Sequence, residues 1–335
     1  MTAPAASILL PAYQAASTLA ACLRSIRRQT MARWECIVVD DGSTDGTAET
    51  AHEIARDDER IRVVSTPHRG VVAALQEGLA RCAAPIVARM DADDVMHRER
   101  LAAQLAALDA APELAAVGCH VRLFPRRDLA PGLRDYERWL NSIDAVRRVE
   151  EEAFVECPVA HPTLVARTAA LRALGYRDAG WPEDYDLVLR MLASGHRVGV
   201  VPRRLIAWRD GPGRLWRTDP RYAVERFTAC KAAFLAGGLL ARVDTYVLLG
   251  YGGTGRALRK ALLAHGKRPS HVVEVHPGRI GKTIHGAPVI SIDQLRRDPR
   301  RPIVASVAGV EARSEIRAAL GGIGFEETRD FVCAA

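Results

Sequence analysis

Short apolar runs alternate with amphipathic segments over the first hundred residues. The runs at 7–11, 35–39, 62–65 and 85–90 are bounded by turn residues, which is typical of buried strands. The segments between them, 17–29, 47–56 and 71–82, are predicted to be helices. Strands and helices in strict alternation predict a doubly wound α/β fold built on a parallel sheet.

The pattern is weaker after residue 100 and becomes regular again near the C-terminus. A helix through Leu108, a strand at 115–124, a polar stretch to Glu152 and helices at 185–194 and 222–240 are expected. A strand at 246–250, a glycine-rich turn and a helix at 256–265 then begin a second, smaller Rossmann-like α/β unit. We therefore predict one domain over 1–240, with halves at 1–100 and 101–240, and another over 244–335.

Composition narrows the class of protein. Apolar residues make up 48% and charged residues 26% of the chain, as in soluble globular proteins. No window approaches the roughly 18 apolar residues of a membrane span, and the N-terminus lacks the basic region of a signal peptide. The seven cysteines are scattered without a CxxC pair, which favours reduced thiols and a cytoplasmic location.

The net charge of +7 comes mainly from arginine. Acidic residues are interleaved and no long basic run occurs, so the sequence does not predict nucleic-acid binding. A solvated basic surface is the simplest interpretation. An anionic substrate, or peripheral contact with an anionic membrane surface, is the next.

Carboxylates follow two of the predicted strands. Asp40 and Asp41 follow the second strand, and Asp91, Asp93 and Asp94 follow the fourth. Ligands of such sheets bind beyond the carboxyl ends of the strands, where these side chains would meet. Mg²⁺ and Mn²⁺ prefer oxygen ligands, often one or two carboxylates plus diphosphate oxygens. The pattern predicts a Mg²⁺ or Mn²⁺ site there, although aspartates that cap the next helix would leave the same pattern.

Several motifs together resemble the family 2 glycosyltransferases, which have the GT-A fold. They are SILLPAY at 7–13, VVDDGSTD at 38–45, RG at 69–70 and ARMDADD at 88–94, with HPT at 161–163 and PEDYDL at 182–187 as downstream landmarks. The resemblance covers roughly residues 5–215. It implies that 1–100 binds the nucleotide of a sugar donor and that 101–240 binds the acceptor.

The resemblance also assigns the donor site. It implies that the loop after the first strand and the Asp-Asp pair after the second hold the base and ribose, and that an arginine reaches the diphosphate. Asp91 and Asp93 would hold the metal and the sugar-phosphate, with Asp93 as the direct ligand. The other donor residues would be Pro11, Ala12, Tyr13, Asp40, Asp41 and Arg69.

Asp184 is the catalytic base that the resemblance implies. Family 2 enzymes that invert the anomeric centre need one carboxylate to deprotonate the acceptor hydroxyl. Glu183 beside it supplies a like charge that would raise the proton affinity of the pair. Both residues would also favour a helix N-terminus without any catalytic role.

His161 and three arginines are further candidates in the downstream region. His161 precedes a proline and is interpreted either as part of the cleft wall or as a contact with donor or acceptor. Arg209, Arg214 and Arg217 lie where the family often has a flexible loop, but the usual His and Ser of that loop are missing. Guanidinium groups there would still suit a diphosphate.

The C-terminal unit carries GxGxxG at Gly250, Gly252 and Gly255, between a predicted strand and helix, with Glu274 after the next strand. With GAPVI at 286–290 it resembles the N-terminal Rossmann-like domain of bacterial sugar acyltransferases, which helps to bind a nucleotide-sugar. A second nucleotide site and a purely structural or dimerising module are equally compatible with the sequence.

The function predicted from the sequence is inverting transfer of a sugar from a nucleotide donor, UDP-sugar favoured, to a glycan or lipid-linked acceptor in envelope polysaccharide synthesis. Mg²⁺ or Mn²⁺ is the expected cofactor, and homo-oligomers are compatible with this function. One alternative is an inactive nucleotide-binding scaffold, which the intact set of Asp91, Asp93 and Asp184 disfavours. The other is an NAD-dependent oxidoreductase centred on the C-terminal unit, which leaves the acidic cluster unexplained.

Overall fold

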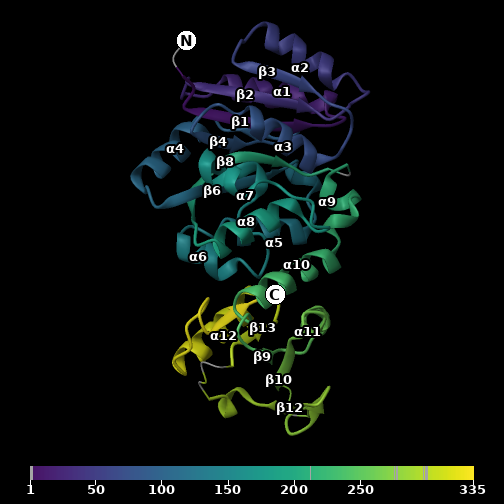
Figure 1. Ribbon diagram of the computed structural model, residues 1–335, viewed down its shortest axis with the longest axis vertical. Coiled ribbons are helices and arrows are strands. Elements are labelled where there is room, and N and C mark those ends of the chain that lie inside the picture. Colours follow the sequence, from purple (N-terminus) through teal and green to yellow (C-terminus); the bar gives the residue numbers. More distant parts are fainter. Residues whose placement is uncertain (1–2, 212, 275, 277, 297, 299–300) are drawn as a thin grey trace. The chain divides into compact units, whose positions relative to one another are not determined.

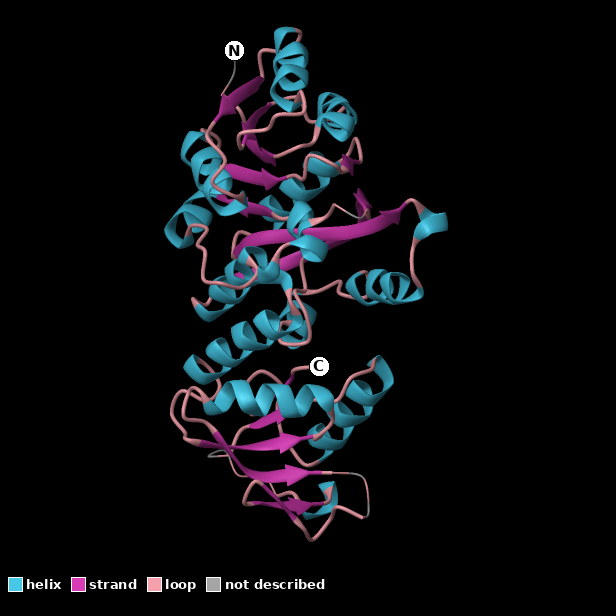
Figure 2. Cartoon of the chain, turned by 90° about the vertical axis from the view of Figure 1, so that its right-hand side faces the viewer, coloured by secondary structure: helices cyan, strands magenta, loops and turns pink. Residues whose placement is uncertain are grey.

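The chain divides into two compact units. A computed structural model describes residues 3–211, 213–274, 276, 278–296, 298 and 301–335. The first unit comprises the residues up to Val149, with Val159–Ala179 and Glu183–Arg214. The second comprises Glu150–Pro158, Gly180–Pro182 and the chain from Leu215 onward. Figure 2 shows the strands of each unit as magenta arrows with cyan helices along them.

The first hundred residues form the predicted alternation of strands and helices (Figure 1). The elements are β1 (Ala6–Ala12), α1 (Ala16–Arg27), β2 (Trp34–Asp40), α2 (Thr47–Arg56), β3 (Ile61–Ser65), α3 (Val71–Arg81) and β4 (Ile86–Arg89). β2 lies between β3 and β1, β4 flanks β1, and all three pairings are parallel. The prediction for this region is confirmed, with boundaries within a few residues.

The rest of the first unit completes an eight-stranded sheet of order β3-β2-β1-β4-β7-β6-β8-β5. Its elements are β5 (Val95–Met96), α4 (Arg100–Ala110), β6 (Leu114–Phe124), α5 (Pro131–Leu140), α6 (Val146–Glu152, whose last residues belong to the second unit), β7 (Val165–Arg167), α7 (Thr168–Leu174), α8 (Glu183–Ala193) and β8 (Arg197–Arg209), with short 3-10 turns at Arg126–Asp128 and His161–Thr163.

The second half of this sheet is mixed rather than parallel. β7 is antiparallel to β4 and to β6, and β5 is antiparallel to β8. β7 has three residues and β5 two, which is too short for a periodic pattern in the sequence. The polar stretch before Glu152 is helical, in α5 and α6.

Burial explains why the first strands read as continuous apolar runs. Every residue of β1, β2 and β4 is buried, because helices cover a parallel sheet on both faces. The core extends into α1 through Leu19, Leu23 and Ile26. This rigid layer fixes the loops that follow β1, β2 and β4 at one edge of the sheet, which is where the candidate site lies.

The second unit is a six-stranded sheet of order β11-β12-β10-β9-β13-β14. Its elements are α9 (Leu215–Thr218), a 3-10 turn (Pro220–Tyr222), α10 (Val224–Gly237), β9 (Thr245–Leu249), α11 (Gly253–Leu263), β10 (Arg268–Val273), β11 (Thr283–Ile284), β12 (Ala287–Ile290), a 3-10 turn (Ile292–Gln294), β13 (Ile303–Ala305), α12 (Val310–Gly322) and β14 (Phe331–Cys333). The second α/β unit predicted from the sequence is present.

The division between the units differs from the predicted boundary near residues 240–244. α10 belongs to the second unit because Ala232 and Leu235 share a buried cluster with Leu248 of β9 and Leu262 of α11. The segment 150–158 belongs there as well. Glu152 is buried in this unit and accepts a hydrogen bond from Arg317 Nη1 at 2.9 Å.

All seven cysteines are buried. Among the described residues, no helix is both long enough and apolar enough to span a bilayer.

Candidate functional site

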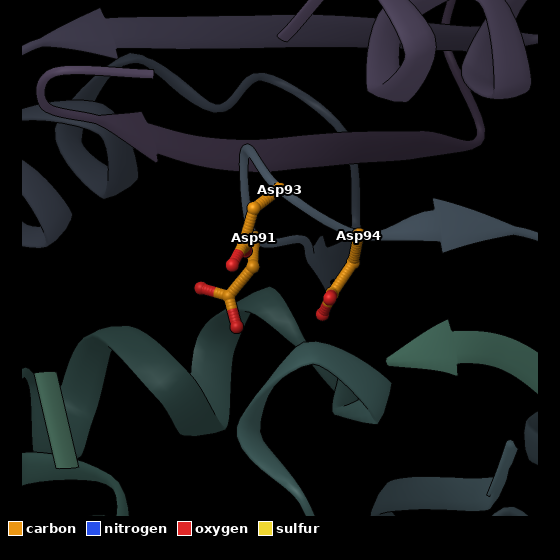
Figure 3. Close-up of side chains that lie close together, drawn as sticks. All are labelled: Asp91, Asp93 and Asp94. Atoms are coloured by element: carbon orange, nitrogen blue, oxygen red, sulfur yellow. The ribbon is translucent and has the colours of Figure 1, made fainter. Parts of the chain in front are cut away.

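Three carboxylates gather in the loop between β4 and β5. Single oxygens of Asp91, Asp93 and Asp94 all lie within 4.8 Å of one another. Figure 3 shows the three side chains projecting to the same side of the loop. Asp94 is fully buried, and its Oδ1 accepts a hydrogen bond from the Arg209 backbone N–H at 2.7 Å. Asp94 thereby ties the loop to the end of β8, while Asp91 and Asp93 keep partly exposed carboxylates.

The charges around this cluster do not favour ionisation equally. Burial, followed by the negative charges of Asp91 and Asp93, raises the pKa of Asp94 well above its ordinary value. Burial and the charge of Asp91 also raise the pKa of Asp93. Burial alone would raise the pKa of Asp91, but the nearby guanidinium groups of Arg89 and Arg214 more than offset it and lower that pKa. The nearby arginines therefore stabilise the ionised form of Asp91 but do not fully offset burial and like charge at Asp93 and Asp94.

The donor set fits a hard divalent cation. All three side chains offer oxygen, the ligand that Mg²⁺ and Mn²⁺ prefer. Asp94 Oδ2 is buried and has no hydrogen-bond partner among the residues that the structure describes, although buried carboxylate oxygens are normally satisfied. Arg214 partly compensates, since its guanidinium nitrogens lie 3.5–3.8 Å from oxygens of all three carboxylates. These residues could hold the cation, with Arg214 beside it.

The residues predicted to hold a nucleotide lie at the ends of β1 and β2. Pro11 and Ala12 end β1 as buried residues, and Tyr13 after them is 49% exposed. The Tyr13 ring stacks on His68, with ring centroids 4.1 Å apart. Two stacked rings at the carboxyl edge of the sheet form a surface on which a planar base can pack.

The two aspartates after β2 differ in what they contact. Both Asp41 carboxylate oxygens are engaged, by the Arg69 and Gly70 backbone N–H groups at 2.9 and 2.8 Å. Asp40 is buried too, but among the described residues its carboxylate accepts only a 3.3 Å hydrogen bond from the Ser43 N–H. Asp41 therefore holds the turn at 69–70, and Asp40 retains the greater capacity to accept from a ligand.

Arg69 was expected at the diphosphate, but its side chain is 55% exposed. Its Nη2 lies 3.7 Å from Glu77 Oε2 on α3. Such an exposed pair contributes little to stability, so the guanidinium retains the freedom to move. Within the described part of the chain, the Arg69 guanidinium pairs with Glu77 and not with a carboxylate of the acidic cluster.

His161 belongs to a buried network that links the acidic cluster to α8. His161 Nε2 lies 3.1 Å from the Tyr176 hydroxyl, and Nδ1 lies 3.9 Å from Glu183 Oε1. Burial, and then the positive charge of Arg89, lower the pKa of His161 well below its ordinary value despite the opposing charge of Asp91. His161 is consequently a neutral imidazole near Asp91, and Tyr176 fixes its orientation.

Glu183 and Asp184 begin α8, and their environments differ. Glu183 is 2% exposed, whereas Asp184 is only partly buried. Asp184 Oδ1 accepts a hydrogen bond from the Tyr185 backbone N–H at 2.7 Å, as expected for a carboxylate in the first turn of a helix. Of the two, Asp184 is the more accessible to a substrate hydroxyl.

The lowered pKa of His161 predicts a pH-dependent stability. The unfolded chain protonates this side chain below about pH 6.5, while the folded chain keeps it neutral. The stabilisation is therefore present above about pH 6.5 and is lost as the pH falls toward the lower folded pKa, at up to about 1.4 kcal/mol per pH unit. Urea unfolding of the wild type and of His161→Gln between pH 5 and 8 tests this. A variant with the same pH slope as the wild type would contradict it.

Two of the three loop arginines lie at the acidic cluster. Arg209 Nε donates to the Asp93 carbonyl oxygen at 2.8 Å, and its guanidinium lies over the Phe124 ring. Arg214 lies among the three carboxylates and over the Trp208 ring. Arg217 belongs to the second unit, where its guanidinium lies 4.1 Å from the Trp216 ring centroid.

The glycine motif of the second unit has the geometry of a tight strand-to-helix turn. Gly250 has φ +89°, a value that favours glycine. A Cβ on Gly255 would lie 2.2 Å from the Gly250 carbonyl oxygen, so only glycine allows this close packing. Glu274 Oε1 accepts from the Tyr251 backbone N–H at 2.9 Å and from Arg279 Nη1 at 3.1 Å. Glu274 thus holds the turn in place, whereas Gly252 is open to the approach of a ligand.

Three residues of the first unit's site were missed from the sequence. The buried Arg89 forms an ion pair with Asp91, His68 stacks on Tyr13, and Tyr176 contacts His161. Arg89 stands two residues before Asp91 and His68 one before Arg69, so proximity to the motifs was the available signal. No local pattern marks Tyr176, which is distant in sequence from every motif that it touches.

Comparison with known proteins gives a consistent result. The model of the family described as Glycosyl transferase family 2 matches residues 7–171. The amylovoran biosynthesis glycosyltransferase AmsE of Erwinia amylovora is 30% identical over 213 residues, which cover 61% of this chain and 76% of that protein. The putative glycosyltransferase EpsE of Bacillus subtilis is 29% identical over 238 residues, which cover 68% and 82%.

Solved structures share the fold. S. aureus TarS in complex with UDP-GlcNAc has a TM-score of 0.54 at 16% identity, over 78% of this chain and 72% of that one. The mannosyltransferase PcManGT of Pyrobaculum calidifontis, in complex with GDP-Man and Mn²⁺, has a TM-score of 0.51 at 21% identity, over 79% and 70%. At these identities the likeness extends to the GT-A architecture of the chain and no further.

Proposed function

The chain belongs to glycosyltransferase family 2, and from that premise we propose that it is an inverting enzyme acting on a nucleotide-sugar with the aid of a divalent cation. The observation that carries the proposal is the cluster of Asp91, Asp93 and Asp94 at the same sheet edge as Asp40 and the stacked Tyr13. A nucleoside diphosphate needs both a surface for its base and positive charge for its phosphates.

The donor would be held by residues of both loops. The base packs at Tyr13 and His68, and Asp40 accepts from the base or the ribose. Asp93, with Asp91, holds Mg²⁺ or Mn²⁺, which when bound stabilises the negative charge of the departing diphosphate. Arg214, whose Nη1 lies 3.8 Å from Asp93 Oδ2, would add a charge-assisted hydrogen bond to the same phosphates. UDP is the favoured nucleotide, and GDP is the main alternative, since PcManGT was solved with GDP-Man.

Asp184 would act as the base. In an inverting displacement the acceptor hydroxyl attacks the anomeric carbon opposite the diphosphate, and its proton passes to a carboxylate on that side. The neutral His161 and the buried Glu183 position the start of α8 relative to Arg89 and Asp91. Asp184 takes the proton at a carboxylate oxygen as the new glycosidic bond forms.

The acceptor proposed here is a glycan or a lipid-linked glycan of a cell-envelope polysaccharide. Relatives support this through their names, which include amylovoran biosynthesis for AmsE and O-antigen biosynthesis for RfbC of Myxococcus xanthus. A cytoplasmic enzyme with peripheral contact to the inner membrane face would suit such an acceptor. The net charge of +7 supports attraction to an anionic surface.

The second unit is proposed as a second nucleotide site. The strand order of its sheet has a topological switch point at β9, because β10 lies on one side of β9 and β13 on the other. Ligands of α/β sheets bind at such a switch point. The open Gly252 follows β9, and Ser306 follows β13. Ser306 Oγ is buried and has no hydrogen-bond partner among the described residues. A nucleotide phosphate would accept from the N–H groups that open α11.

Calorimetric titration with UDP, GDP, dTDP and NAD, each with and without Mn²⁺, tests the proposal. We expect one nucleoside diphosphate to bind in a Mn²⁺-dependent manner. Binding of no diphosphate would overturn the donor proposal. Metal-independent binding of NAD alone would move the function to the second unit.

A further inference from the structure

A pocket rich in arginine lies on the first unit away from the acidic cluster. It is a cavity of about 650 Å³ between α5 and β8, lined by Arg126, Arg134, Arg138 and Arg204 with the acidic Asp135 and Glu137. A second cavity of about 190 Å³ shares Arg126, Glu137 and Arg204 and adds Arg122 of β6. We call the two together the arginine pocket. Ligand pockets of small molecules commonly have several hundred Å³.

The charges of the arginine pocket are not balanced. Its five guanidinium groups face two carboxylates. Glu137 pairs with Arg126, and Asp135 pairs with Arg138. Arg122, Arg134 and Arg204 have no carboxylate partner within the part of the chain that the structure describes, although Arg134 Nη2 donates to the Arg126 carbonyl oxygen at 3.1 Å. Three positive charges therefore remain for a ligand.

The framework around these side chains is well anchored. Asn141, at the end of α5, exchanges two hydrogen bonds of 2.9 Å with the backbone of Val121 on β6. Buried Glu137 accepts from the Leu123 N–H at 3.3 Å. α5 is therefore fixed along β6, and the guanidinium groups extend from a rigid base. These exposed guanidinium groups therefore start from fixed backbone positions.

The pocket lies too far from the acidic cluster to share its ligand phosphates. Arg204 stands five residues before Arg209 on β8, and Arg209 contacts Asp93 and Asp94. At about 3.3 Å per residue, this separation along the strand is roughly 17 Å. One diphosphate cannot bridge that distance, so an anion in the arginine pocket would be a second one. The strand nonetheless joins the pocket to the site, as does β6 through Phe124, whose ring lies under Arg209.

We propose that the arginine pocket binds a phosphate or diphosphate group carried by the acceptor, while the donor diphosphate occupies the acidic cluster. The identification of this ligand as the acceptor rests on the proposed transferase function. Guanidinium groups pair bidentately with phosphate oxygens, and three unbalanced charges suit a multiply charged anion better than a single carboxylate. The ligand would place its reacting hydroxyl toward Asp184 and hold its anionic end in the pocket.

The test is calorimetric titration of the full chain with inorganic pyrophosphate in the presence of chelator, because the donor site as proposed needs a metal. We expect the wild type to bind. Arg122→Gln with Arg204→Gln should weaken binding at least about tenfold, since each removes a charge-assisted hydrogen bond. Arg203→Gln, an exposed neighbour on β8 that pairs with Glu99 instead, should change it less than twofold.

A second titration, with farnesyl diphosphate, identifies the source of the phosphate. Tighter binding than pyrophosphate, again lost in the double variant, supports a lipid diphosphate. Equal binding of both probes, lost in the double variant, supports a soluble phosphorylated acceptor. Absence of pyrophosphate and farnesyl diphosphate binding, or binding that the double substitution leaves unchanged, overturns the proposal.

The two proposals fail independently. Mn²⁺-dependent nucleotide binding should be the same in the double variant and in the wild type, which also shows that the variant is folded. Loss of that binding in the wild type would refute the donor site, whatever pyrophosphate does in chelator.

Discussion

Replacing Asp184 with asparagine is expected to lower turnover of the donor by about 10²- to 10⁴-fold, the usual contribution of a general base. The assay is release of nucleoside diphosphate from the nucleotide-sugar, with water as the acceptor, so that the natural acceptor is not required. Asparagine keeps the size of the side chain and an oxygen that can accept from the Tyr185 N–H. The fold and the helix start should therefore survive, and only proton transfer should be lost.

Two comparisons separate this effect from structural damage. Nucleotide binding with Mn²⁺ should be unchanged in Asp184→Asn, because the base acts on the acceptor side. Asp109→Asn, at an exposed position of α4, removes an aspartate charge elsewhere in the same unit and should leave turnover unchanged. Turnover of Asp184→Asn within about threefold of the wild type would assign the base to another residue.

The first ninety-five residues could be predicted because their signals are local. Each of β1, β2 and β4 is buried on both faces, so each reads as a continuous apolar run that ends in a turn. The acidic residues then follow strand ends, and parallel strands necessarily bring those ends to one edge. Motif spacing and topology therefore gave the positions of Asp40, Asp91 and Asp93 together.

The second half of the sheet could not be predicted in this way. β8 is long, but it contains Pro202 and four arginines and shows no clean alternation. It forms because β6 pairs with it over most of its length, including two shifts of register near His120. Such pairing depends on contacts some eighty residues apart, which no local window contains.

The roles within the site also depended on non-local contacts. Asp40 and Asp41 are adjacent in the sequence and equally suited to a nucleotide, yet only Asp41 has both carboxylate oxygens engaged by the turn at 69–70. Similarly, Asp91, Asp93 and Asp94 differ in their environments. Asp94 alone among them is fully buried and hydrogen-bonded to the end of β8. Residue type predicts the chemistry of a cluster, and the surrounding fold decides which member is available to a ligand.

Asp93 is more available to a ligand than Asp94, so a substitution of Asp93 should have the larger effect on metal binding. Asp93→Asn should weaken Mn²⁺-dependent binding of the nucleoside diphosphate by about a hundredfold or more, or ~3 kcal/mol. Asp93 is the partly exposed member whose pKa is raised by burial and by the charge of Asp91, so a bound cation offsets its unfavourable charge directly. Asparagine offers one neutral oxygen in place of the charge and gains much less from the metal.

Asp94→Asn is the matched control, since it makes the same carboxyl-to-amide change in the same loop. Asp94 is fully buried and its pKa is raised well above the ordinary value, first by burial and then by its two acidic neighbours. Asparagine can still accept from the Arg209 N–H through its side-chain oxygen and avoids burying a charge. We therefore expect nucleotide binding within about tenfold of the wild type and a thermal midpoint in chelator at least as high. The reverse ranking, with Asp93→Asn tolerated and Asp94→Asn unable to bind, would mean that the cation is held by the buried carboxylate, and that Asp93 acts only through the loop.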